Sequence, residues 1–128
     1  MLSPFAPSFA FETARWCQEH NVAVVAHSPL AGAFQKGKVA ADATIAAISA
    51  KHPLLKTAPQ VMLRWAIQKG FCVIPGSGNP KHQVSNLEIY GAELSAEDMA
   101  QLDALKDHEG FFYQDMREAK ASTNKDEA

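Results

Sequence analysis

The chain has 128 residues, a formal net charge of −2 and 47% hydrophobic residues, which is typical of one globular domain. The near balance of acidic and basic residues, without a basic patch, argues against nucleic acid as a partner, because phosphate neutralisation needs clustered Lys and Arg. The longest apolar runs are too short to span a bilayer, and the opening residues lack the pattern of a secretory signal. We therefore expect a cytoplasmic protein without a membrane partner.

The cysteines and histidines give no sign of a metal site. Cys17 and Cys72 lie far apart, each inside an apolar pattern and without a CxxC partner, so we expect small buried hydrophobes rather than a disulfide or a ligand pair. The five histidines are scattered without ligand spacing. The sequence predicts no bound metal.

The first predicted elements are a helix and a strand. Ser8 is a candidate N-cap for a helix over residues 9–20, and Asn21 suits the left-handed position that follows a helix. The run VAVVAH at residues 22–27 is nearly all apolar and β-branched. That pattern is typical of a parallel strand buried on both faces. A glycine-containing loop is expected over residues 28–40.

Two further helices follow. Asp42 is the expected N-cap of a short helix that ends near His52. The clearest helix start is TAPQ at residues 57–60, where Thr57 and Gln60 have the spacing of a capping box. Gly70 would end that helix. Its expected buried face consists of Val61, Met62, Trp65 and Ala66.

The last predicted elements are a strand and two helices. FCVI at residues 71–74 predicts a second buried strand. After a glycine turn, Asn79 as N-cap and Pro80 as first residue open a helix. Ser95 is the expected cap of a final amphipathic helix. Its inward residues would be Met99, Leu102 and Leu105.

The two helix-to-strand passages form an internal repeat of about fifty residues. In this register Trp16 corresponds to Trp65, and Ser28 corresponds to Ser77. Both tryptophans are expected in the core or in helix packing. The strand–helix alternation predicts an α/β fold with right-handed crossovers, either a doubly wound sheet or a β/α barrel.

In both architectures the ligand site lies at the carboxyl ends of the strands. This places His27, Ser28 and Leu30 beside Gly76 and Ser77. Only two strands are evident, with MLSPF as a candidate end of a third. Because two parallel strands leave sheet faces and edges uncovered, the sequence indicates part of a larger fold.

Three segments together resemble the C-terminal part of an aldo-keto reductase: NVAVVAHSPLAGA, APQVMLRWAIQKGFCVIPGSGNPKHQVSN and AELSAEDMAQLDAL. They occur in the family's order and spacing, and they cover most of the chain from about Ser3 to Lys106. The resemblance implies a partial (β/α)8 TIM barrel, with the last two to three strands and their helices, over residues 1–118. The small, polar residues 119–128 are expected to form a disordered tail.

The resemblance also implies carbonyl reduction with NADPH as cofactor. His27 occupies the position of an aromatic residue, usually Tyr, that stacks on the nicotinamide. Ser28 and Leu30 match positions along the pyrophosphate. Ser77 matches a serine that binds the 2′-phosphate, and Asn86 matches an asparagine that contacts adenine.

Two positions depart from the commonest family pattern, which has Lys at the position of Gly76 and Arg at that of His82. The loss of two cations should weaken the selection of NADPH over NADH, although some branches resemble this version. The family's catalytic Asp, Tyr, Lys and His come from strands that precede every segment seen here. No catalytic residue is assigned, because no Tyr with a neighbouring Lys is available to protonate a carbonyl oxygen.

The opening MLSPF is similar to the family's HPF strand end, with Ser3 in the position of the His. We therefore expect the chain to begin in the middle of a barrel, as a truncated gene product, an incomplete gene model or an excised fragment would.

From the residues alone, the corner around Ser77 and Asn79 has two interpretations. It is either an anion site at a helix N-terminus or a glycine-rich turn in which Ser77 caps locally. The resemblance favours the anion site. His27 suits equally a stacking platform and a partly buried residue at a strand end.

Three functions stay open. The first is the C-terminal segment of an NADPH-dependent aldo-keto reductase. The family resemblance implies NADP(H) and a small carbonyl substrate as its ligands, and we expect the segment alone to be inactive. The second is a non-catalytic interaction module or truncated remnant that self-associates through exposed sheet edges or joins a companion chain. The third, a doubly wound nucleotide-binding domain, needs more strands than are found.

Overall fold

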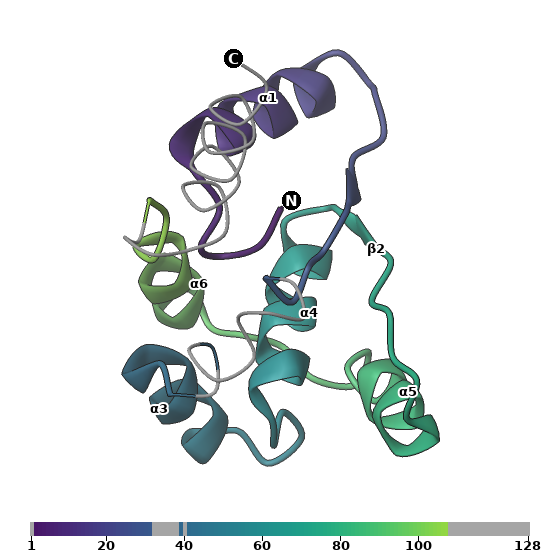
Figure 1. Ribbon diagram of the computed structural model, residues 1–128. Helices are drawn as coiled ribbons and strands as arrows, with labels where there is room; N and C mark the ends of the chain where they lie inside the picture. The colour runs from purple at the N-terminus through teal and green to yellow at the C-terminus, as the bar shows by residue number, and fades with distance from the viewer. Residues whose placement is uncertain (1, 32–38, 40, 108–128) are drawn as a thin grey trace, which may run out of the picture.

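The computed structural model describes residues 2–31, 39 and 41–107. The elements in chain order are α1 (Ser8–Glu19), β1 (Val25–Ala26), α3 (Ala43–Lys51), α4 (Ala58–Gln68), β2 (Cys72–Val73), α5 (Pro80–Leu87) and α6 (Ala96–Asp103) (Figure 1). β1 and β2 form a two-stranded parallel sheet in which Val25 lies opposite Cys72. The predicted alternation of helix and strand is therefore confirmed. The expected tail at 119–128 and most of the loop at 28–40 lie outside the described residues.

Helix starts follow the local sequence. The Asp42 carboxylate accepts a hydrogen bond from the Ile45 amide at 3.0 Å, and the Ser95 hydroxyl accepts one from the Asp98 amide at 3.1 Å. At Thr57 the predicted capping box is only half formed. The Thr57 hydroxyl accepts from the amide of Gln60. The Gln60 side chain accepts from the Lys56 amide and from the Thr57 hydroxyl, instead of from the Thr57 amide that a capping box requires. Caps are predictable because both partners lie within one turn of the chain.

The start of α1 is an exception. Ser8 is not the N-cap: that residue is Pro7, which supplies no side-chain bond. The Asp107 carboxylate instead accepts from the Ser8 amide at 2.8 Å and from the Ser8 hydroxyl. These bonds lower the pKa of Asp107. A carboxylate from the other end of the described chain therefore caps α1 and complements its dipole.

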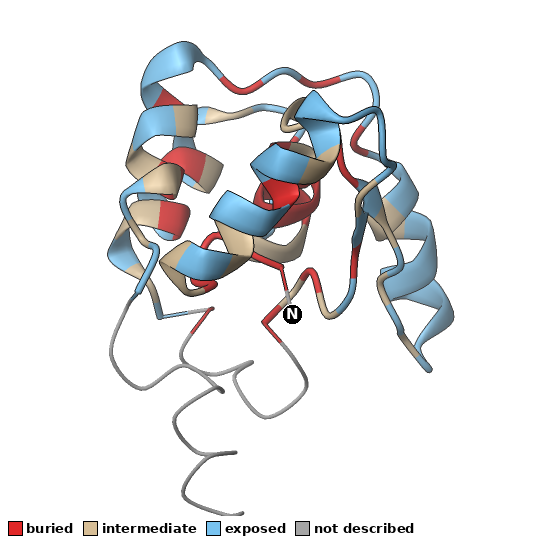
Figure 2. Ribbon diagram, turned by 90° about the horizontal axis from the view of Figure 1, so that it is seen from above, coloured by how far each residue is buried: buried red, intermediate tan, exposed pale blue. Residues whose placement is uncertain are grey.

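The core is built around α4. Its residues Val61, Met62 and Trp65 are fully buried, as predicted, and α4 packs against α3, α5 and β2. Figure 2 shows the buried residues concentrated at the centre of the helical layer. The Trp65 ring packs edge-on against two phenylalanines, and its Nε1 donates to Asp103 Oδ1 at 2.9 Å. A buried indole thus has both an apolar environment and a hydrogen-bond partner.

Trp16 does not share that environment, so the prediction for this tryptophan is wrong. Its side chain is 56% exposed and stacks on His20 with a ring separation of 4.0 Å. The repeat thus has the same order of elements but different packing. α1 has few buried residues and lies at the edge of the structure (Figure 1). One face of this helix therefore has no covering element among the described residues.

The prediction of strands buried on both faces is also wrong. Ala26 and Phe71 are buried at 0% and 5% exposure, whereas Val25 and Ile74 are 54% and 57% exposed. Such alternation means that the described helices cover only one face of the sheet. Cys72 lies on the open face and is exposed, while Cys17 is partly buried, so neither is the fully buried hydrophobe expected from the sequence.

The opening residues run beside β1 without forming a strand in the described structure. The Leu2 amide donates to the His27 carbonyl oxygen at 3.0 Å, and Ser3 is fully buried. The candidate third strand is therefore represented by a single backbone hydrogen bond. None of the helices in the described ranges is long and apolar enough to cross a membrane.

Gly70 is expected to tolerate no larger residue. Its φ of +79° lies in the left-handed region, and a Cβ placed there would lie 3.0 Å from the side-chain nitrogen Nε2 of Gln18. We expect Gly70→Ala to lower the free energy of unfolding by about 1 kcal/mol. Urea unfolding followed by circular dichroism would measure this loss. Gly78→Ala is the matched control, since a Cβ there meets no atom within 4 Å; equal losses in both variants would contradict the explanation.

Candidate functional site

The predicted site residues follow the two strands. His27 and Ser28 come directly after β1, and Gly76 and Ser77 come shortly after β2. Because the strands are parallel neighbours, both loops leave the same edge of the sheet. β2 then leads into α5, which packs against α4 (Figure 1).

The loop after β1 is a tight turn. Ser28 has a φ of +51°, and the Ala31 amide donates to the Ser28 carbonyl oxygen at 3.0 Å. The Ser28 hydroxyl lies 3.3 Å from Nδ1 of His27. His27 is exposed, while Leu30 is partly buried against the core. This turn presents the imidazole to solvent, with Ser28 as a neighbour that limits its rotation.

The turn after β2 and the start of α5 satisfy several of their own amide groups. The Asn79 amide donates to the Ser77 hydroxyl at 3.2 Å, and the Lys81 amide donates to the Asn79 side chain at 3.0 Å. The amides of His82 and Gln83 donate to the Asn79 carbonyl oxygen. The local-cap interpretation of Ser77 therefore describes this geometry. An anion at this corner would have to exchange with these bonds or use side chains.

Of the remaining predicted residues, Gly76 precedes α5, and His82 and Asn86 lie within it. Gly76 is exposed, and a Cβ there would meet no atom within 4 Å. His82 is exposed and Asn86 is partly buried. The corner therefore has room for the side chains that the commonest family pattern carries, and it holds no cation at either position.

Gln60 holds α5 in place, a role that the sequence did not reveal. α5 has no buried residue of its own. The Gln60 side chain is nearly fully buried, and its Nε2 donates to the Ser85 carbonyl oxygen at 3.0 Å. A glutamine at N3 of a helix indicates local capping, and no further signal predicted its contact with a helix 25 residues away.

A second polar cluster lies between α3 and α6. The Asp98 carboxylate is nearly fully buried, pairs with Lys51 and lies 3.3 Å from Nε2 of His52. Burial alone would raise the pKa of Asp98, but hydrogen bonds from Lys51, Ser95 and His52 lower it to about 2. This cluster joins the end of one helix to the start of another. In the described ranges, no group of three or more His, Cys, Asp or Glu residues is arranged to hold a metal ion.

Comparisons with known proteins agree on one family. The model of the Aldo/keto reductase family matches residues 2–107. An aldo-keto reductase of Mycobacterium ulcerans is 37% identical over 89 residues, which are 70% of this chain and 29% of that protein. The 9,11-endoperoxide prostaglandin H2 reductase of Trypanosoma cruzi is 34% identical over 102 residues, which are 79% of this chain and 35% of that protein.

Solved structures show the same relationship. Gox0644 in its apo form has a TM-score of 0.71 and 33% identity, and the match covers 85% of this chain and 37% of that chain. A mutant of Gox0644 in complex with NADPH gives a TM-score of 0.70. The aldo-keto reductase MGS-M4, from a deep-sea metagenome library, gives a TM-score of 0.70 at 29% identity, covering 77% of this chain and 36% of that one.

The chain thus spans about a third of the length of the relatives it matches. Its helices and two parallel strands are consistent with part of the barrel that these neighbours form. Since the family model matches most of the chain, the predicted family is confirmed. The protein belongs to the aldo-keto reductase family of oxidoreductases.

Proposed function

We propose that the chain provides the last two to three strands of an NADPH-dependent aldo-keto reductase barrel, over residues 1–118, and carries the adenosine and 2′-phosphate end of the cofactor site. The observation that carries this proposal is the pair of loops that leave one edge of a parallel sheet. The NADPH complex of a relative with the same local fold supports the cofactor. Residues 119–128 would follow as a tail, and the protein would act in the cytoplasm.

Each loop has a separate task in this proposal. The exposed His27 stacks on the nicotinamide, and the Ser28 hydroxyl near its Nδ1 orients the ring. Ser28 and Leu30 lie along the pyrophosphate. Ser77 binds the 2′-phosphate: its hydroxyl donates to a phosphate oxygen in place of the Asn79 carbonyl oxygen and still accepts from the Asn79 amide. Asn86 contacts adenine from α5.

Gly76 and His82 leave the 2′-phosphate without fixed cations. We expect the double variant Gly76→Lys, His82→Arg to bind NADPH at least about tenfold more tightly, because a charge-assisted hydrogen bond contributes about 1.5 kcal/mol or more. The space around Gly76 admits the new side chain. Calorimetric titration of the purified chain with NADPH and, separately, with NADH would measure the change.

In the same double variant, Ser77→Ala should remove part of the gained affinity for NADPH. It should leave the affinity for NADH unchanged, because NADH has no 2′-phosphate. Thr13→Lys with Ala43→Lys, at exposed positions outside the corner, adds the same positive charge and serves as the control for altered net charge. Equal gains for both cofactors would sink the assignment of a 2′-phosphate site.

The proposed chemistry of the family is hydride transfer from NADPH to a carbonyl carbon, with a proton delivered to the oxygen. In this proposal none of the described residues is assigned to deliver that proton. Hence the chain alone should bind the cofactor without turnover. Incubation of the purified chain with NADPH and an aromatic aldehyde tests this statement: steady consumption of NADPH would overturn it.

A second candidate function has a specific observation in its favour. The open sheet face, defined by Val25, Cys72 and Ile74, is exposed and mostly apolar, and exposed apolar patches mark interaction surfaces. In this alternative the chain is a non-catalytic module that self-associates or joins a companion chain. Light scattering after gel filtration discriminates: a monomer at high concentration contradicts self-association, and co-purification with the remaining part of a barrel supports a companion.

A further inference from the structure

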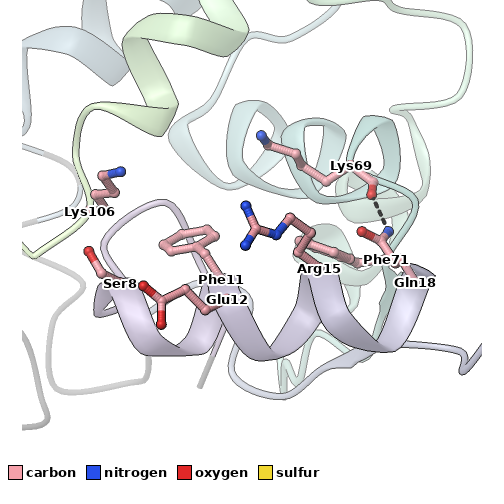
Figure 3. Close-up of a pocket in the computed structure, with 8 residues that line it drawn as sticks. All are labelled: Ser8, Phe11, Glu12, Arg15, Gln18, Lys69, Phe71 and Lys106. Atoms are coloured by element: carbon pink, nitrogen blue, oxygen red, sulfur yellow. Dashed lines mark hydrogen bonds between the residues drawn. The ribbon is translucent and has the colours of Figure 1, made fainter. Parts of the chain in front are cut away.

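A groove outside the proposed cofactor corner lies between α1 and the end of α4. Its volume is about 430 Å3, which is within the range of small-molecule sites. The eight residues that line it are Ser8, Phe11, Glu12, Arg15, Gln18, Lys69, Phe71 and Lys106 (Figure 3). None of them belongs to the proposed cofactor site.

Cationic side chains outnumber acidic ones among the residues that line the groove. Three of its lining residues are cationic, Arg15, Lys69 and Lys106, against the single carboxylate of Glu12, whereas the chain carries a net charge of −2. In Figure 3 the Arg15 guanidinium lies on one side of the Phe11 ring and Lys106 on the other, and the Glu12 carboxylate lies on the side of Ser8. Arg15 and Lys106 thus offer two cationic groups to a ligand that lies beside the Phe11 ring.

Each of these cations already has an acidic neighbour. Arg15 pairs with Glu19 at 3.7 Å, with side chains that are 75% and 62% exposed, and such exposed pairs contribute little free energy. Lys69 is held more firmly, because its partner Asp103 also accepts a hydrogen bond from the Trp65 indole. Lys106 attracts the Asp107 carboxylate, which also accepts from Ser8. A ligand anion would therefore compete with Glu19 for Arg15 and with Asp107 for Lys106.

An aromatic wall completes the groove. Phe11 packs edge-on against Trp65 at 5.9 Å, and Trp65 packs against Phe71 at 6.1 Å, so the Phe11 ring is fixed in orientation. Phe11 is only partly buried, and its remaining surface faces the groove. At one end the Gln18 side chain donates to the Lys69 carbonyl oxygen at 2.7 Å and joins the two helices.

We propose that this groove binds a small aromatic carboxylate, with the ring on Phe11 and the carboxylate between Arg15 and Lys106. A flat apolar ring suits a fixed phenyl wall, and a guanidinium is suited to paired hydrogen bonds with a carboxylate. The groove and the proposed cofactor corner share no residue.

Amide NMR spectra of the full-length chain test the proposal with three probes at equal ionic strength: 2-naphthoate, the neutral 2-naphthylmethanol and acetate. We expect 2-naphthoate to shift the amides around Phe11, Arg15 and Phe71 in a saturable manner, and the other two probes to bind at least about tenfold more weakly. Equal effects of the neutral probe or of acetate, shifts elsewhere, or no shifts would each overturn the proposal.

Matched variants separate the groove from general charge effects. Arg15→Gln with Lys106→Gln should raise the dissociation constant for 2-naphthoate about tenfold. Lys56→Gln with Lys81→Gln removes the same charge from exposed sites outside the groove and should leave the constant unchanged. Equal weakening in both double variants would show that only net charge matters and would overturn the proposed site.

Discussion

Trp65→Ala is expected to lower the free energy of unfolding by about 3–5 kcal/mol, the cost of emptying a large aromatic site in a packed core. Trp65 is fully buried, contacts Phe11 and Phe71, and holds Asp103 through its Nε1. The loss is comparable with the whole stability of a small domain. The variant should therefore be largely unfolded, and urea titration followed by near-ultraviolet circular dichroism would measure this.

Trp16→Ala provides the matched control, because Trp16 is 56% exposed and contacts chiefly His20. Its cost should be within about 1 kcal/mol. Trp65→Phe, which retains most of the ring volume but leaves Asp103 without its indole partner, should give an intermediate loss. Similar losses in the free energy of unfolding for the two alanine variants would contradict the conclusion that Trp16 and Trp65 have different environments.

Asp98→Asn is expected to lower the free energy of unfolding at neutral pH by about 2 kcal/mol, since it weakens charge-assisted hydrogen bonds at a buried site. The carboxylate joins Lys51 and His52 at the end of α3 to the capping box of α6. The estimate stays below that for a fully buried pair because the Lys51 side chain is 49% exposed. Urea unfolding at pH 7 would measure the loss.

The same carboxylate predicts a dependence on pH. The pKa of Asp98 is lowered from 3.8 to about 2 in the folded chain, so the unfolded chain takes up the proton first as the pH falls. Its contribution of roughly 2 kcal/mol is therefore complete above about pH 4 and is lost as the pH falls towards 2. Asp107, whose pKa is also lowered, acts in the same direction.

The pH profile of Asp98→Asn checks this assignment. Between pH 4 and pH 2 the variant should lose clearly less stability than the natural chain does. Glu97→Gln, at the exposed neighbouring position, should retain the natural profile. An unchanged profile in Asp98→Asn would show that other carboxylates are responsible for acid unfolding.

Local signals in the sequence predicted helix starts well. Asp42, Thr57, Asn79 and Ser95 each accept a hydrogen bond from an amide in the first turn of the helix that follows. Asn21 and Gly70 have the positive φ expected after a helix. These features depend on residues that lie within a few positions of one another, which is the range that a sequence pattern reports directly.

Contacts between distant segments were not predictable in this way. The cap of α1 comes from Asp107, 99 residues beyond Ser8, and Gln60 anchors α5 through Ser85. The prediction that both strands are buried on both faces was wrong for a related reason. A run of apolar residues shows that a strand can be covered on both faces, but it does not show which covering elements are present.

By itself the sequence determined the order of helices and strands, the N-caps of every described helix except α1, the family, and the positions of a candidate cofactor corner. Only the tertiary structure decided that one sheet face is open, that Trp16 and Trp65 have opposite environments, and that the amides near Ser77 are already paired. The physical reason is that capping and periodicity depend on neighbours in the chain, whereas burial and charge pairing depend on segments that meet only after folding.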